Sequence, residues 1–339
     1  YAGDKLYENR NGKFVDISTA AGIKGTPLGY GLGVAVGDIN GDSWPDIYVS
    51  NDFVEPDYLY INNRNGTFTE LMSEYFQHIS HFSMGSNLND FNNDGAVDLF
   101  TLDMLPEDNK RQKLLYGPEN YEEYARRVAS GFYFQDMRNM LHLNNANGTF
   151  SEIGQLAGIS NTDWSWSALS ADFDNDGWKD MFITNGYYKD VTNKDFLKFR
   201  GDYYFDQSVK KSKVDTTYIV NQTVSTPIHN YIFKNTGNLK FEDKSRCWDI
   251  DQPGFSNGAA YSDLDNDGDL DLVTNNIDAK ASIYENLTNK LLPDHHYLAL
   301  DLKGKDKNTG AYNAKVNVYS NEGMQSYEKM PVRGFQSSV

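Results

Sequence analysis

The sequence predicts an all-β fold in the form of a β-propeller. Three observations lead to this prediction: a unit of strand-like segments recurs four times in the 339 residues, each unit holds about four such segments, and glycine-containing turns join them. The composition is typical of a folded, turn-rich chain, because 14% of the residues are aromatic and 28 are glycine. A chain of this length can bury a sizeable core.

Each unit begins with a predicted β-hairpin whose first strand ends in Asn. These first strands lie at 6–9, 59–62, 141–144 and 232–235, and a fifth at 283–286 ends the pattern. Tight turns follow at Asn11-Gly12, Asn65-Gly66, Asn147-Gly148 and Thr236-Gly237, where glycine supplies the positive φ of the turn. The hairpin starts are 53, 82, 91 and 51 residues apart, so a unit of about 52 residues carries two insertions.

A glycine-rich strand follows each hairpin. In the first unit Gly31, Gly33 and Ala35 alternate with larger residues, which gives the strand one thin face and permits close packing. An aromatic residue stands eight positions before the first Asp of the loop in every unit: Tyr30, Phe82, Trp164 and Phe255. Beyond the loop, short strands at 47–49, 99–101, 181–183 and 272–274 complete about four strands per unit, as in a propeller blade.

Two insertions, 105–137 and 187–228, interrupt the units. Both follow the strand after the Asp-rich loop, so we expect them on the face of the ring opposite these loops. The first should contain a helix that starts at Pro118, carries Tyr121 and Val128 on one stripe, and acts as a lid or plug. The second insertion gives no clear prediction, and a purely structural role for both remains open.

Charge and cysteine content exclude several classes of protein. The formal net charge is −17, which repels nucleic acid and anionic membranes. The single cysteine, Cys247, excludes a disulfide framework and a zinc site with several Cys ligands, and we expect it to be a small buried residue. No stretch approaches the ~18 apolar residues of a membrane span, and we expect any signal or lipid anchor upstream of Tyr1.

The Asp-rich loops carry the strongest functional signal. Asp or Asn occupies positions 1, 3, 5 and 9 of each loop: Asp38, Asn40, Asp42 and Asp46; Asp90, Asn92, Asp94 and Asp98; Asp172, Asp174, Asp176 and Asp180; Asp263, Asp265, Asp267 and Asp271. Side chains at alternating positions of a tight turn converge on one point, and Ca²⁺ prefers six to eight oxygen ligands. Position 7 varies freely (Trp44, Ala96, Trp178, Asp269), as a ligand that binds through its backbone carbonyl would.

The same residues bear on the alternatives to a β-loop calcium site. An EF-hand is excluded because position 12 is Val49, Thr101, Ile183 or Thr274 instead of Glu, and because strands flank the loops. Mg²⁺ is the second choice of metal, and solvated Asp-Gly turns without metal are the structural alternative. Position 6 is Gly in three loops, whereas Ser43 makes the first site the least regular.

We expect up to four structural Ca²⁺ ions, each joining two strands of a blade. Their affinities should be those of extracellular modules, roughly 10⁻⁴ to 10⁻³ M. Four ions would reduce the net charge from −17 to −9 and relieve repulsion among 14 loop aspartates. Sites this weak fill outside cells, so the loops predict an extracellular location.

These motifs resemble the FG-GAP or VCBS repeats of integrin α-subunit propellers and of many bacterial surface proteins, over residues 1–288. The tail, 289–339, resembles the start of an ASPIC/UnbV domain, in 296–304, 314–316 and 333–338, and it breaks off at Val339. The combination is similar to large lipoproteins of Bacteroidetes and, more distantly, to cartilage acidic protein. The resemblance implies a calcium-binding module of the outer-membrane surface, part of a larger, seven-bladed ring.

For function, the sequence favours a non-catalytic binding or adhesion module whose partner is a protein or a glycan at the cell surface. An accessory subunit of a SusC/SusD-like outer-membrane transporter or of a secretion complex is the alternative, and a glycan-processing enzyme is a third. The histidines form no recognisable triad or ligand spacing: His78, His81, His142, His229, His295 and His296. We expect Trp164 to pack in the core, while Trp166, Tyr187 and Tyr188 are candidates for stacking on sugar rings.

Overall fold

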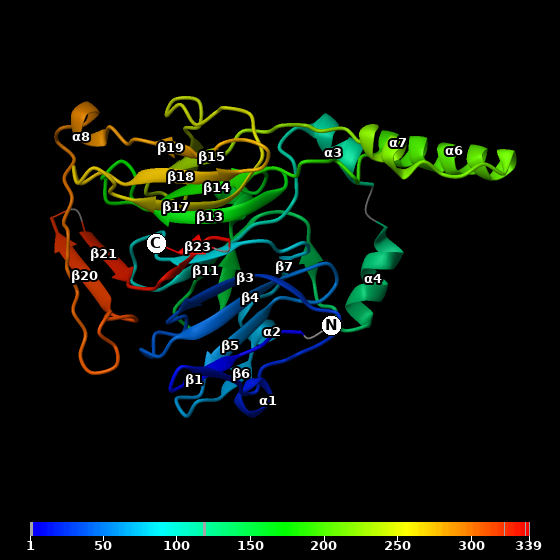
Figure 1. Cartoon of the computed structure of the whole chain (residues 1–339). Coiled ribbons are helices and arrows are strands. Elements are labelled where there is room, and N and C mark those ends of the chain that lie inside the picture. Colours follow the sequence, from blue (N-terminus) through cyan, green and yellow to red (C-terminus); the bar gives the residue numbers. More distant parts are fainter. Residues whose placement is uncertain (1–2, 118–119, 322, 336, 339) are drawn as a thin grey trace.

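The computed structural model describes residues 3–117, 120–321, 323–335 and 337–338. Its main feature is a row of antiparallel sheets that lie side by side like propeller blades (Figure 1). The first sheet has the order β3 (Tyr30–Gly37), β4 (Asp46–Asp52), β5 (Tyr58–Asn62) and β6 (Phe68–Glu70). The second has β8 (Ser86–Asn89), β9 (Asp98–Thr101), β11 (Met140–Asn144) and β12 (Phe150–Glu152). The all-β prediction is confirmed.

The later sheets repeat this order. The third has β13 (Ser165–Ala171), β14 (Asp180–Asn185), β15 (Tyr231–Asn235) and β16 (Phe241–Asp243). The fourth, with β17 (Ser256–Ser262), β18 (Asp271–Asn276) and β19 (Ser282–Tyr284), has three strands within the described residues. Short helices α1 (Ser18–Ala21), α2 (Met72–Tyr75), α5 (Gly154–Ala157) and α8 (Thr288–Leu291) follow the hairpin segments.

The sheets do not begin and end at the same residues as the repeat units of the sequence. Each hairpin pairs with the two strands that precede it in the chain, so β5 and β6 complete the sheet begun by β3 and β4. The first hairpin, β1 (Tyr7–Arg10) and β2 (Lys13–Asp16), therefore forms a two-stranded sheet of its own. The four complete units of the sequence thus become three complete four-stranded sheets in the part of the chain that the structure describes.

Glycines let the inner strands of neighbouring sheets approach closely. Strand β3 lies against β8, β8 against β13, and β13 against β17. A Cβ atom on Gly33 would lie 2.5 Å from the carbonyl oxygen of Met84, and one on Gly85 would lie 2.1 Å from that of Trp166. The thin face predicted for the glycine-rich strands is therefore the surface on which the blades meet.

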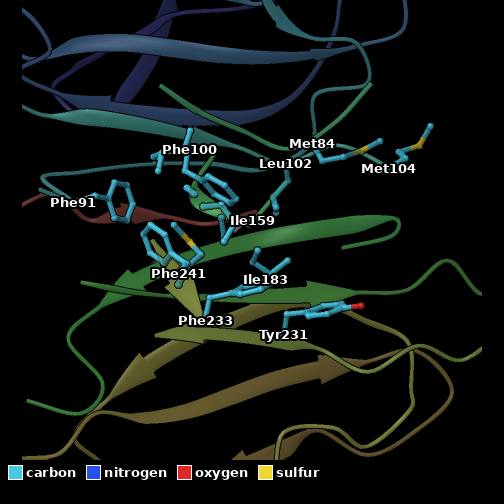
Figure 2. Packing of buried hydrophobic residues seen from close by; sticks show 14 residues of the cluster. Met84, Phe91, Phe100, Leu102, Met104, Ile159, Ile183, Tyr231, Phe233 and Phe241 are labelled. Carbon is cyan, nitrogen blue, oxygen red and sulfur yellow. The ribbon is translucent and has the colours of Figure 1, made fainter. Parts of the chain in front are cut away.

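Three hydrophobic clusters fill the spaces between successive sheets. Figure 2 shows the central cluster, in which Phe100 and Leu102 of the second blade face Ile183 and Phe233 of the third. Strand β14 serves two clusters: Met181 and Ile183 belong to this one, and Phe182 belongs to the cluster against the fourth sheet. A similar cluster, with Tyr48, Leu59 and Leu99, joins the first and second sheets. Each blade is thus held by burial against its neighbours.

The insertions are helical. The first contains α3 (Asn109–Leu115), α4 (Tyr121–Ala129) and β10 (Gln135–Asp136), which pairs in parallel with β7 (Ile79–Ser80). Helix α4 begins at Tyr121 with Asn120 as its cap; Pro118, where we expected the start, lies outside the described residues. The expected stripe is not buried, since Tyr121 is 81% exposed.

The second insertion forms α6 (Lys194–Lys210) and α7 (Thr216–Asn221), which project away from the sheets as an arm (Figure 1). Arg111 of α3 ties the two insertions to the blades. It bonds Asp163, which precedes β13, and its Nη1 lies 2.9 Å from Asp190 Oδ2 in the second insertion. Asp163 and Asp190 are both buried, so this ion pair fixes the base of the arm.

The described part of the tail packs on the opposite side of the sheets (Figure 1). Its hairpin, β20 (Lys315–Ser320) and β21 (Gly323–Glu328), contacts the first three Asp-rich loops. The backbone N–H of Asp38 donates to the carboxylate of Glu328 at 3.1 Å, and Lys315 Nζ donates to the carbonyl of Gly95 at 2.8 Å. A short pair, β22 (Val332–Arg333) and β23 (Ser337–Ser338), lies against the inner strands β3 and β17. The helices of the two insertions and the Asp-rich loops therefore lie on opposite sides of the sheets, as the spacing predicted.

Cys247 corrects the sequence analysis, because it is exposed and not buried. It lies in the turn after β16, in which Ser245 and Ile250 face inward. A single residue in a short turn belongs to no periodic pattern, so the sequence could not predict whether its side chain faces the core or the solvent. Among the described residues, no helix is both long and apolar enough to cross a membrane.

Candidate metal centres

Each Asp-rich loop joins the inner strand of a sheet to the next strand, and its own backbone already shapes it. The carboxylate at position 1 accepts hydrogen bonds from the backbone N–H groups of positions 5 and 6 in all four loops. In the third loop, Asp172 accepts from Asp176 at 3.0 Å and from Gly177 at 2.8 Å. Position 5 accepts in turn from the N–H of position 7. The loops are therefore rigid turns with their side-chain oxygens on the inside.

The left-handed backbone at position 6 explains the glycines. Gly95, Gly177 and Gly268 have φ of 88°, 91° and 97°. Ser43 adopts a φ of 68° at the same place, so the first loop keeps the shape of the others at the cost of some backbone strain. Ser43, which the sequence marked as the irregular residue, therefore adds backbone strain but leaves the fold of the first loop unchanged.

The carboxylate at position 9 closes the loop. One of its oxygens accepts the N–H of position 2, and the other accepts the N–H of the Asn that ends the next hairpin strand. Asp180, for example, accepts from Phe173 at 3.1 Å and from Asn235 at 2.9 Å. All four of these aspartates are buried. Position 9 thus has a structural role whether or not a metal is bound.

The Asn residues at the hairpins are functional positions that the sequence analysis did not select. We call Asn62, Asn144, Asn235 and Asn286 the latch asparagines. The side-chain amide of Asn235 donates to the carbonyl of Lys179 in its own loop and to that of Phe91 in the loop of the preceding blade. Asn144 and Asn286 repeat the pattern. Their recurrence at the end of every hairpin strand was the available signal.

Residues 1–49, 44–101 and 128–183 each match the family model described as FG-GAP-like repeat. The chain contains FG-GAP-like repeats. Each match includes a hairpin, the Asp-rich loop after it and at least part of the strand beyond that loop, and the three matches include the first three loops. No curated protein matches the chain.

The four Asp-rich loops differ in how many carboxylates they gather. In the third, oxygens of Asp172, Asp174 and Asp176 lie within 4.8 Å of one another, and Asp263, Asp265 and Asp267 of the fourth do the same. The first and second loops have Asn40 and Asn92 at position 3, whose amides donate to the carboxylate at position 5. The third and fourth loops therefore carry the greater negative charge.

Burial makes these carboxylates costly to ionise. It raises the pKa of Asp98 to about 8 and that of Asp172 to about 7, although backbone N–H donors act in the opposite direction. Burial also raises the pKa of Asp46 to about 6. A cation in each loop would offset both the burial and the mutual repulsion of the carboxylates.

Basic side chains form ion pairs with carboxylates of two of the loops. Arg64 Nη2 lies 2.8 Å from Asp42 Oδ2 in the first loop. In the third, Lys234 bonds Asp174, and its Nζ lies 2.7 Å from Asp176 Oδ2. Lys179 is buried between the second and third loops, where its Nζ donates to Asn93 Oδ1 at 2.9 Å.

The donor set of the loops fits a hard divalent cation. Positions 1, 3 and 5 offer carboxylate or amide oxygens, and no nitrogen or sulfur donor belongs to the pattern. In the third loop Asp174 is only 4% exposed, and its Oδ1 has no hydrogen-bond partner. The residues therefore fit Ca²⁺, with position 9 available only through oxygens that also accept backbone N–H groups.

Two of the histidines, His78 and His142, are neighbours, and Trp164, Trp166 and Tyr187 cluster at the base of the second insertion. His142 is buried with its Nε2 3.1 Å from the carbonyl of His78, and His81 bonds Arg127 of α4. Trp164 stacks on Tyr187 with ring centroids 4.1 Å apart and packs against the central cluster. These rings support the base of the second insertion.

Proposed function

We propose that the protein is a non-catalytic binding module of the adhesion type, stabilised by calcium and working outside the cell. The observation that carries this proposal is the repetition of four rigid loops, three of them within FG-GAP-like repeats, that each hold three or four aspartates at the same offsets. Repeats of this kind suggest an extracellular module of the adhesion type.

Calcium would be held by the side chains at positions 1, 3, 5 and 9 and by the backbone carbonyl at position 7. The ion supplies positive charge that neutralises buried carboxylates. The chain's own residues do the rest: position 1 sets the turn, position 9 ties the loop to the hairpin, and the latch asparagine ties it to the preceding blade. A cation in a loop thus stabilises contacts between blades.

The test is thermal and urea unfolding of the full chain in calcium and in chelator, together with calcium binding by calorimetry. At calcium concentrations of 10 to 100 times Kd, each occupied site adds about 1.4 to 2.7 kcal/mol to the free energy of unfolding. The Asp265→Asn, Asp267→Asn double variant should lose one site, whereas Asp206→Asn on the arm should lose none. Equal stability in calcium and chelator, without heat of binding, would refute the proposal.

His142 and His81 bond a backbone carbonyl and an arginine, and the loop carboxylates bond backbone N–H groups, which favours a binding role over catalysis. Binding or adhesion then depends on surfaces outside the loops. The insertion face is the candidate surface, because the tail covers the loop face.

The arm favours the second candidate, an accessory subunit of an outer-membrane assembly such as a SusC/SusD-like transporter. Phe205 and Val209 of α6 are 69% and 67% exposed, and Val220 of α7 is 57% exposed. Apolar residues on a projecting helix indicate a protein contact. Co-purification from solubilised surface membranes should yield a stoichiometric partner with the native protein and not with a Phe205→Ser, Val209→Ser variant. Recovery of the same partner with both proteins would contradict a role for the arm.

A further inference from the structure

The third loop contains a cation of the protein's own. Lys234, the fourth residue of β15, directs its ammonium group at positions 3 and 5 of the loop. It bonds Asp174, and its Nζ lies 2.7 Å from Asp176 Oδ2. The Lys234 side chain is 24% exposed, so solvent screens this pair only partly.

The same place in the other blades has no basic residue. The residue before the latch asparagine is Ile61 in the first sheet, Leu143 in the second, Lys234 in the third and Glu285 in the fourth. The third and fourth loops have the same four aspartates at positions 1, 3, 5 and 9. These two loops therefore share their ligand aspartates and differ beside them in charge at three places: Lys234 against Glu285, Lys179 against Leu270, and Trp178 against Asp269.

The third loop is nevertheless built to accept a further ligand. Asp174 is 4% exposed, Lys234 bonds its Oδ2, and its Oδ1 is buried without a partner. A buried carboxylate oxygen without a partner is costly. One ammonium group therefore leaves the oxygen set of this loop incompletely satisfied.

We propose that Lys234 is a tethered counter-ion of the third loop, which calcium must displace, so that this loop binds calcium more weakly than the fourth. The inference rests on the proposed calcium function. An ammonium group at two of the ligand oxygens repels a divalent ion and occupies its coordination positions. At low calcium the ammonium group of Lys234 neutralises the loop carboxylates, and at high calcium the ion replaces it.

Terbium luminescence can follow the third loop separately. Trp178 is position 7 of this loop and can sensitise Tb³⁺ bound in it, whereas position 7 of the fourth is Asp269. The test uses the full chain with Trp44→Phe, which removes the other tryptophan at a position 7. Lys234→Met should tighten Tb³⁺ binding at the third loop on the order of tenfold, because it removes the competing charge and keeps the length of the side chain. Lys234→Arg should keep the weak binding.

The control for net charge is Lys244→Met, which removes a lysine that pairs with Glu242 outside the loop. It should leave the affinity for Tb³⁺ unchanged. A reciprocal variant, Glu285→Lys, adds an ammonium group beside the fourth loop at a side chain that is 60% exposed. Calorimetry should then show calcium affinity falling at one site, on the order of tenfold.

The possible failures are distinguishable. If Lys234→Met and Lys244→Met bind Tb³⁺ with equal affinity, or Glu285→Lys leaves calcium binding unchanged, the inference is wrong and the calcium function stands. If none of the proteins binds Tb³⁺ or calcium, both the inference and the proposed function are wrong.

Discussion

Replacing the latch asparagine Asn235 by alanine tests how the blades are joined. Its side chain is 1% exposed and makes three hydrogen bonds to backbone groups. The amide donates to the carbonyl of Phe91 at 2.9 Å and to that of Lys179 at 3.2 Å, and Oδ1 accepts the N–H of Gly237 at 3.0 Å. At about 1 kcal/mol for each bond, Asn235→Ala should lower the free energy of unfolding by about 3 kcal/mol.

The assay is urea unfolding at constant calcium, followed by circular dichroism and tryptophan fluorescence. The matched control is Asn145→Ala, because Asn145 is exposed and bonds Thr149 across a surface turn. The control should lose no more than about 0.5 kcal/mol. Equal losses in the two variants would show that the latch adds nothing beyond a surface hydrogen bond.

Two other predictions concern blade packing and pH. Gly85→Ala places a Cβ 2.1 Å from the backbone oxygen of Trp166, so it should lower the free energy of unfolding by about 3 kcal/mol or prevent folding. Gly201→Ala in α6 is the control, because its Cβ meets no atom within 4 Å, and it should raise the free energy of unfolding by about 0.5 to 1 kcal/mol. Urea unfolding measures both changes. Burial lowers the pKa of His142 to about 4, so the stability from its neutral form is complete above about pH 6.5 and is lost as the pH falls toward 4. Between pH 7 and pH 5 the native protein should lose about 2 kcal/mol more than His142→Gln; equal losses would contradict this role.

Local patterns predicted most of the elements. The turns after the hairpin strands, the glycine-rich strands and the loop offsets are each encoded within about ten residues, so they could be read directly. The sequence could not predict which strands each hairpin joins, because a hairpin can pair with the strands before it or after it without any change in its own sequence. The helices of the second insertion lacked a signal, since α6 carries apolar residues on two faces.

The sequence predicted the ligands of the candidate site but not the side chains that surround them. Asp174 and Asp176 follow from spacing, whereas Lys234 reaches them from a strand about 60 residues further along the chain. Arg111 likewise joins Asp163 and Asp190 through contacts that no local pattern records. Side-chain pairs that depend on tertiary packing need the structure.

The direction of the latch bonds has a consequence for synthesis on the ribosome. Asn144 donates to Ile39, Asn235 to Phe91 and Asn286 to Phe173, so each acceptor carbonyl belongs to chain made earlier than its donor. As each new hairpin leaves the exit tunnel, the loop that receives it has already been translated. The molecule can therefore assemble vectorially, one blade onto the last, without waiting for its C-terminus.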